Sequence, residues 1–166
     1  RGQIEKMLRL TVYRDFSKLY RFANVEQRKF LALYFKRYEV SVIKECLNTV
    51  FDHRDVVLNL SIFDEFFNKH SQLDINLLAS SRTIEELIAN LKGTEYYAPL
   101  SQLADIERPT LFDYEMTLDL YYFAQMWKDR SKVVTKRDLE ELTAAWGSKF
   151  DMLNLQWIYR SKRYYH

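Results

Sequence analysis

The residues best suited to chemistry in this 166-residue chain are three histidines, His53, His70 and His166. A metal site needs a second histidine or a carboxylate at ligand spacing on a helix face, and none of the three has one. We therefore interpret them as exposed histidines in loops or at the end of the sequence. The sequence also contains no glycine-rich phosphate loop, no nucleophile elbow and no CxxC pair.

Four carboxylates are the remaining candidates for acid–base catalysis: Asp113 with Asp119, and Glu140 with Glu141. Neither pair has the four-residue spacing that brings two side chains together on one helix face. Charges at such positions are usually solvated. The sequence thus predicts a protein that is not an enzyme and has no cofactor or metal site.

Arg160, Lys162 and Arg163 lie among tyrosines, a mixture that also occurs on nucleic-acid-binding surfaces. The whole chain, however, has 25 Lys and Arg against 23 Asp and Glu, with the two signs interleaved. Nucleic-acid binding needs a concentrated basic face, so we do not expect it. The helix dipole favours cations at a helix C-terminus, which explains this basic stretch better.

The composition is typical of a helical protein. Only 3 Gly and 2 Pro are present, too few for a fold with many sharp turns, and the hydrophobic fraction of 48% is that of a folded chain. No apolar run approaches the roughly 20 residues that a membrane span requires. We therefore predict an all-α protein without a membrane span, in which Cys46 on an apolar helical stripe is buried.

Apolar residues at three- and four-residue spacing predict a series of helices. These cover about 4–22, 25–50, 58–69, 83–92, 96–103, 111–127 and 139–165, with a polar link at 128–136. Asn24 is expected to cap the second helix. Thr83 and Glu86 form a reciprocal capping pattern, and Gly93 is expected to end that helix in a left-handed conformation.

One pattern occurs twice. The stretch from Phe35 to Ile43 matches the stretch from Phe150 to Ile158 at a constant offset of 115 residues (150 − 35). This repeat indicates two helical units in tandem, and the loop-like stretch at 105–109 suggests where they join. We predict a first unit with linker helices at 1–104 and a second, incomplete unit at 105–166.

Asn154 and Arg160 lie on or beside the apolar face of the last predicted helix. A polar side chain there must find a partner, because its desolvation otherwise costs a few kcal/mol. One interpretation is a buried polar clamp between helices. The other is a direct contact to a partner protein.

Three stretches resemble the V-type ATPase subunit d family, whose archaeal and bacterial members are the C subunits of A/V-type ATP synthases. FDYEMTLDLYYFAQMW is similar to a family helix with a Leu-Asp pair followed by two aromatic residues, here Leu118, Asp119, Tyr122 and Phe123. FDMLNLQWIYRSKRYY is similar to an Asp-x-x-Asn-Leu…Arg-x-Lys signature, here Asp151, Asn154, Leu155, Arg160 and Lys162. LLASSRTIEELIANLKGTEYYAPL is similar to the family's linker helix. In the first unit the match is weaker, because Glu39 replaces the Asn and Lys36 replaces the Asp.

The resemblance covers most of the chain and implies helical bundles, repeated with pseudo-threefold symmetry, that form a funnel. This chain would be a fragment or truncated member with at most two of the repeats. The implied role is mechanical: a non-catalytic subunit on the cytoplasmic face of the membrane that links the central shaft to the proteolipid ring during proton or sodium transport. The signature residues are then structural.

The alternative is a helical adaptor that binds proteins or peptides. Solenoid repeats usually have shorter periods than 115 residues and need several copies, which disfavours this alternative.

Overall fold

The computed structural model describes residues 2–53 and 58–133. Within these residues every regular element is a helix, which confirms the all-α prediction. The chain divides into two compact units, residues 1–129 and 130–166, and the description below concerns the first. The predicted helix at 139–165, with Asp151, Asn154 and Arg160, lies outside the described residues, as do Glu140 and Glu141.

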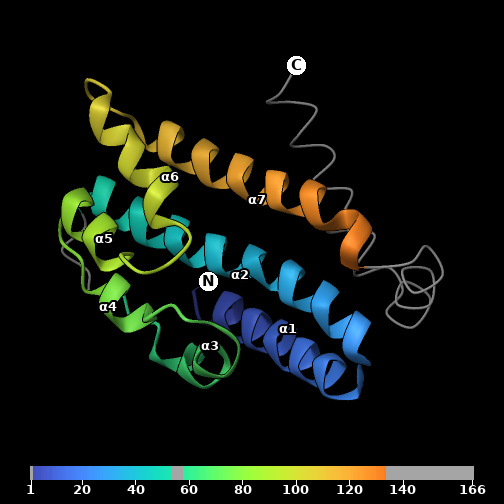
Figure 1. The fold of residues 1–166 in the computed structure, drawn as a ribbon. Helices are drawn as coiled ribbons and strands as arrows, with labels where there is room; N and C mark the ends of the chain where they lie inside the picture. The colour runs from blue at the N-terminus through green and yellow to red at the C-terminus, as the bar shows by residue number, and fades with distance from the viewer. Residues whose placement is uncertain (1, 54–57, 134–166) are drawn as a thin grey trace. The chain divides into compact units, whose positions relative to one another are not determined.

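Two long antiparallel helices, α1 (Gly2–Phe22) and α2 (Val25–Phe51), lie side by side in this unit (Figure 1). Asn24 begins α2, as predicted. Its side chain accepts a hydrogen bond from the Gln27 backbone N–H at 2.8 Å, and the Asn24 N–H donates to the Gln27 side chain at 3.0 Å. This reciprocal cap satisfies two N–H groups at the helix start and fixes the tight connection between the two helices.

A run of short helices packs against the long pair. Its members are η1 (Ser61–Phe63), α3 (Asp64–His70), α4 (Ile75–Ala79), α5 (Ile84–Asn90), α6 (Tyr97–Ser101) and η2 (Gln102–Asp105). The helices α4 and α5 contact α2, and α3 contacts α1. As predicted, the Thr83 hydroxyl caps α5 by accepting from the Glu86 N–H at 3.1 Å, and Gly93 has a φ of 89°. The Glu86 carboxylate accepts from the Arg82 N–H at 2.9 Å, one residue earlier than the reciprocal pattern predicts.

The helix α7 (Leu111–Val133) lies alongside α2 (Figure 1). The Thr110 N–H donates to the Asp113 carboxylate at 2.7 Å, and the Asp113 N–H donates back to the Thr110 hydroxyl at 3.3 Å. The predicted polar link at 128–136 is wrong for residues 128–133, which continue α7. Exposed charges such as that of Lys128 suit the outer face of a helix, so they do not end it.

Aromatic rings fill the core between α1, α2 and α3. Tyr13 stacks on Phe66 with ring centroids 4.3 Å apart, and it meets Phe63 edge-on at 5.2 Å. The first copy of the repeated pattern belongs to this core, since its apolar residues Phe35, Val40, Val42 and Ile43 are all buried. Ring pairs in such arrangements each contribute about 0.5–1.5 kcal/mol beyond the burial of their area.

Cys46 is the single cysteine of the chain and lies in the interior of α2. Its side chain is 2% exposed, which confirms the predicted burial. Burial raises the pKa of the thiol to about 12 because the thiolate would lose its hydration. Cys46 therefore behaves as a small apolar side chain of the core.

Candidate functional site

Of the residues that carry the family resemblance, Leu118, Asp119, Tyr122 and Phe123 lie on α7. Leu118 and Tyr122 are buried, and burial raises the pKa of the Tyr122 hydroxyl. Asp119 is half-buried and accepts a hydrogen bond from the Lys44 ammonium at 2.6 Å. The expectation of a solvated Asp119 is therefore wrong. The carboxylate takes part in an ion pair with a lysine that lies 75 residues earlier in the sequence.

Asp113 keeps its contact with solvent, as expected, and it also has a structural role that the sequence analysis did not assign. Its carboxylate accepts hydrogen bonds from the Thr110 backbone and side chain at 2.7 and 2.8 Å. Both hydrogen bonds lower the pKa of the Asp113 carboxyl, and the bond from the backbone N–H has the larger effect. Asp113 thus serves as a cap of α7.

Lys44, Asn48, Glu115 and Asp119 form a polar seam between α2 and α7. The Asn48 amide donates to the Glu115 carboxylate at 2.9 Å, and the Lys44 ammonium pairs with Asp119 as described. Lys44 and Asn48 are four residues apart on α2, and Glu115 and Asp119 are four residues apart on α7. The earlier residue of α2 pairs with the later residue of α7. This arrangement is possible only for antiparallel helices in one register, so the polar seam fixes how α7 lies on α2.

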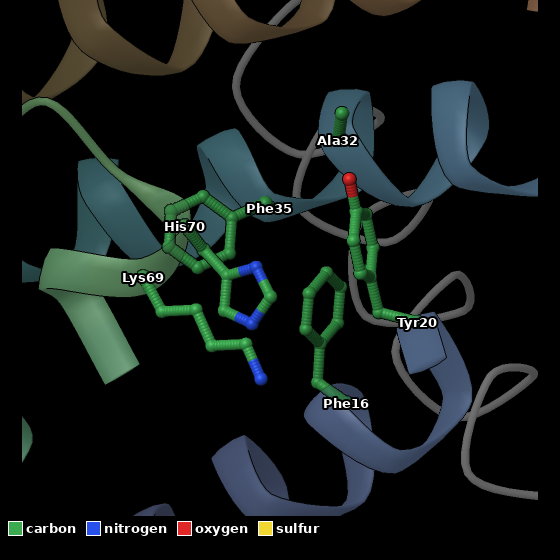
Figure 2. A pocket seen from close by; sticks show the side chains of 6 residues that line it. All are labelled: Phe16, Tyr20, Ala32, Phe35, Lys69 and His70. Carbon is green, nitrogen blue, oxygen red and sulfur yellow. The ribbon is translucent and has the colours of Figure 1, made fainter. Parts of the chain in front are cut away.

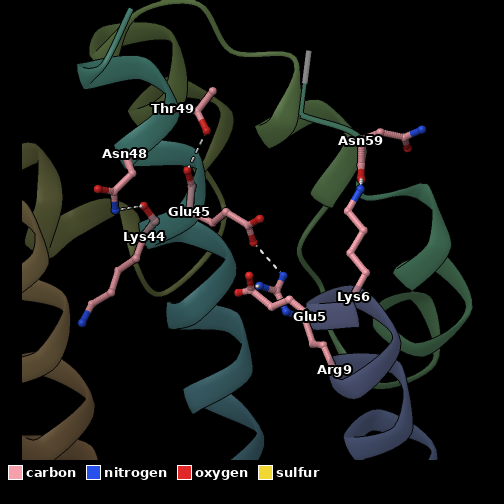
Figure 3. A network of polar contacts seen from close by, with 8 residues as sticks. All are labelled: Glu5, Lys6, Arg9, Lys44, Glu45, Asn48, Thr49 and Asn59. Carbon is pink, nitrogen blue, oxygen red and sulfur yellow. Dashed lines mark hydrogen bonds and ion pairs between the residues drawn. The ribbon is translucent and has the colours of Figure 1, made fainter. Parts of the chain in front are cut away.

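The neighbouring residue on α2, Glu45, faces α1 instead (Figure 3). Its carboxylate accepts from the Arg9 guanidinium at 2.6 Å, and the Arg9 guanidinium also lies over the Phe63 ring, 5.3 Å from its centroid. The side chains of this ion pair are 22% and 29% exposed. Lys44 and Glu45 are consecutive in α2, and they therefore connect α2 to α7 and to α1, respectively.

Glu39, Ser71 and Tyr96 form a third connection, the Glu39 clamp. The Glu39 carboxylate is half-buried and accepts from the Ser71 hydroxyl at 2.8 Å and from the Tyr96 hydroxyl at 3.2 Å. Burial raises the pKa of the Glu39 carboxyl. The clamp joins α2 to the turn after α3 and to the start of α6. Glu39 occupies the place in the first repeat that Asn154 occupies in the second.

The histidine prediction is wrong for His70, which is a half-buried residue at the end of α3 (Figure 2). Its ring meets those of Phe16 and Tyr20 edge-on, with centroids 5.6 and 5.0 Å apart. The Ser17 hydroxyl lies 3.4 Å from Nε2. Burial lowers the pKa of His70, and the charge of Lys69 adds to this effect. His53 is exposed in the turn after α2, as predicted, and His166 lies outside the described residues.

A cavity of about 180 Å³ adjoins this histidine. It is lined by Phe16, Tyr20, Ala32, Phe35, Lys69 and His70. Elsewhere, the outer face of α1 carries the apolar side chains Ile4, Met7, Leu8 and Val12, which are 41–68% exposed. This cavity and this apolar stripe are two features of unit 1 that other molecules can reach.

Metal binding and membrane insertion each require a recognisable arrangement of residues. Among the described residues, no three His, Cys, Asp or Glu side chains are placed to hold a metal ion. Across residues 2–53 and 58–133, no helix has the length and apolar character needed to cross a membrane.

The comparisons with known proteins agree on one family. The family model for the ATP synthase (C/AC39) subunit matches residues 1–166. The A-type ATP synthase C subunit of Methanocaldococcus jannaschii is 24% identical over 162 residues, which cover 96% of this chain and 40% of that protein. The chain thus spans about 40% of the length of this curated relative. No solved structure gives a significant match. Because the family model matches the whole of residues 1–166, the chain belongs to the ATP synthase (C/AC39) subunit family.

Proposed function

We propose that this chain is a non-catalytic coupling subunit of a V/A-type rotary ATPase, which links the central shaft to the membrane proteolipid ring on the cytoplasmic side. The observation that carries the proposal is the family match over residues 1–166. The name of the archaeal relative, an A-type ATP synthase C subunit, supports it. In this role the chain transmits torque and leaves ATP chemistry to other subunits.

A coupling subunit must resist deformation, and the contacts around α2 support such a role. The Arg9–Glu45 ion pair ties α1 to α2, and the Lys44–Asp119 ion pair ties α7 to it. The Glu39 clamp adds the short helices on a third side. Close-packed interiors have low compressibility, so a helix braced in three directions transmits force with little loss.

We further infer that the repeated pattern reflects two related bundles, residues 1–104 and 105–166, which each supply part of a funnel with pseudo-threefold symmetry. The constant offset of 115 residues (150 − 35) between the two copies supports this inference. The first helix of the second sequence unit, α7, packs against α2 of the first through the polar seam.

Affinity capture tests the proposed function. The full chain is immobilised and exposed to detergent-solubilised membranes of its host, and the proteins that remain after a moderate-salt wash are identified by mass. Proteolipid ring and shaft subunits are expected together. Recovery of unrelated soluble proteins would instead favour a helical adaptor, and recovery of no ATPase subunit would refute the coupling role of this chain.

Two variants on the short helix α5 provide the controls. Leu87 is fully buried, so Leu87→Asp places a charge in the core, should unfold unit 1 and should abolish capture. Glu85 is exposed on the same helix, and Glu85→Asp should capture as much as the unaltered chain. Equal recovery with both variants would show that the retained proteins bind non-specifically.

A further inference from the structure

The cavity beside His70 has walls from three helices (Figure 2). Two rings come from α1, Phe16 and Tyr20, while α2 contributes Ala32 and Phe35 and α3 contributes Lys69 and His70. Its volume is about 180 Å³. An apolar protein cavity of about 150 Å³ accepts benzene, so this cavity has room for one aromatic ring with a short substituent.

The walls are held in place by contacts among the rings themselves. Phe16 contacts Phe35 with centroids 5.6 Å apart, and His70 contacts Tyr20 at 5.0 Å and Phe35 at 5.7 Å. A cavity whose walls are already ordered binds a ligand without the entropy cost of arranging them. The ring faces and edges that line it suit a planar aromatic ligand.

The charge around the cavity favours a ligand of one charge over the other. Lys69, an exposed residue, is one of the lining residues and brings a positive charge, and the lining residues that the structure describes include no carboxylate. His70 favours the neutral form, because burial and Lys69 lower its pKa. An ammonium group disfavours the cations that aromatic cages usually bind and attracts an anion. Ala32 is the smallest lining residue, so a larger side chain at this position would take up part of the cavity volume.

We propose that this cavity binds one aromatic ring that carries a carboxylate, with the ring among Phe16, Tyr20 and Phe35 and the carboxylate beside Lys69. Two sources share this chemistry. One is a free aromatic acid, and the other is the C-terminal aromatic residue of a polypeptide.

Binding is measured on the full chain by calorimetry and by amide chemical shifts in nuclear magnetic resonance, with phenylacetate as the first probe. A ligand of this size is expected to bind with a Kd of about 1 mM. The shift changes should centre on His70, Tyr20 and Phe35. Phenethylamine has the same ring with the opposite charge, and it should bind at least about tenfold more weakly.

Variants with matched controls locate the site. Ala32→Leu fills the cavity and should abolish binding, whereas Ala89→Leu changes an alanine of α5 that is not among the lining residues and should leave the Kd unchanged. Lys69→Gln should raise the Kd about two- to fivefold, as for an exposed ion pair, whereas Lys18→Gln, at an exposed position of α1 that is not among the lining residues, should not.

The two sources are separated with short peptides that end in Phe. A peptide with a free carboxylate that binds more tightly than phenylacetate, and loses this advantage when amidated, identifies a chain end as the ligand. Equal or weaker peptide binding identifies a free acid. The proposal is overturned if phenylacetate and the free-carboxylate peptide both fail to bind the unaltered chain, if phenethylamine binds as well as phenylacetate, or if the shifts centre away from the cavity.

Discussion

Replacing Glu39 with Gln removes a titrating group from the Glu39 clamp and keeps its shape. Burial raises the pKa of the Glu39 carboxyl, and the charge of Glu95 acts in the same direction, while the hydrogen bonds from Ser71 and Tyr96 act against it. A glutamine can still hydrogen-bond both hydroxyls, because its oxygen accepts from one and its NH₂ donates to the other. The main change is therefore the loss of a proton-binding group in the folded state.

The sign of the effect follows from proton linkage. Because the pKa of Glu39 is higher in the folded than in the unfolded chain, the folded state binds more protons between the two pKa values. The free energy of unfolding of the unaltered chain then falls as the pH rises from the ordinary Glu pKa of 4.5 to the folded-state pKa. One proton gives a slope of at most about 1.4 kcal/mol per pH unit. Glu39→Gln lacks this contribution, so its stability relative to the unaltered chain should rise with pH over the same interval and then level off.

Urea unfolding followed by circular dichroism, in half-unit steps from about pH 4.5 to 8, measures this difference. Glu107→Gln, at an exposed residue of the loop before α7, is the control. Its difference from the unaltered chain should stay within about 0.5 kcal/mol at every pH. If the curve for Glu39→Gln is as flat as that of the control, the Glu39 carboxyl titrates alike in the folded and unfolded states, and the argument from burial is refuted.

Three further substitutions test the packing and the helix ends by urea or thermal unfolding. Leu118→Ala should lower the free energy of unfolding by about 2–5 kcal/mol, because Leu118 is fully buried. Leu120 is 46% exposed on the same helix, so Leu120→Ala should cost less than about 1 kcal/mol, and equal losses would contradict the packing face of α7. Thr83→Ala removes the cap of α5 and should lower the free energy of unfolding by about 1 kcal/mol. Thr83→Ser keeps the hydroxyl and should recover most of this loss. An unchanged stability in the alanine variant would show that the cap is dispensable. Gly93→Ala should cost about 1 kcal/mol, seen as a fall in Tm of about 2–4 °C, because an L side chain is strained at a φ of 89° even where open space surrounds it; a rise in Tm would contradict this.

Features that depend on a few neighbouring residues were accessible from the sequence. The caps at Asn24 and Thr83 and the left-handed Gly93 were predicted because each involves hydrogen bonds or backbone angles within one helical turn. The same three-residue spacing is present in Thr110 and Asp113, where it marks the start of α7. This cap was missed although its signal is local, because the charge of Asp113 suggested only catalysis or solvation.

The contacts that join the helices had no such local signal. Asp119 meets Lys44 across 75 residues, and Glu39 meets Ser71 and Tyr96 across 32 and 57 residues. A single sequence shows that these residues are polar and does not show which pairs meet. His70 follows the same logic, because its immediate neighbours are polar and suggest a loop, whereas the rings that bury it come from α1 and α2.

The burial of Cys46 has a practical consequence for spectroscopy. A thiol with a pKa of about 12 is almost wholly protonated at neutral pH, while maleimide reagents react with the thiolate. Since the sequence contains no second cysteine, the native chain is a low-background host for site-directed labels. A cysteine introduced at an exposed position then carries the fluorophore or spin label alone. Pairs of such labels, one before residue 129 and one after residue 130, would measure the distance between the two units of the chain and how it changes when the proposed partners are added.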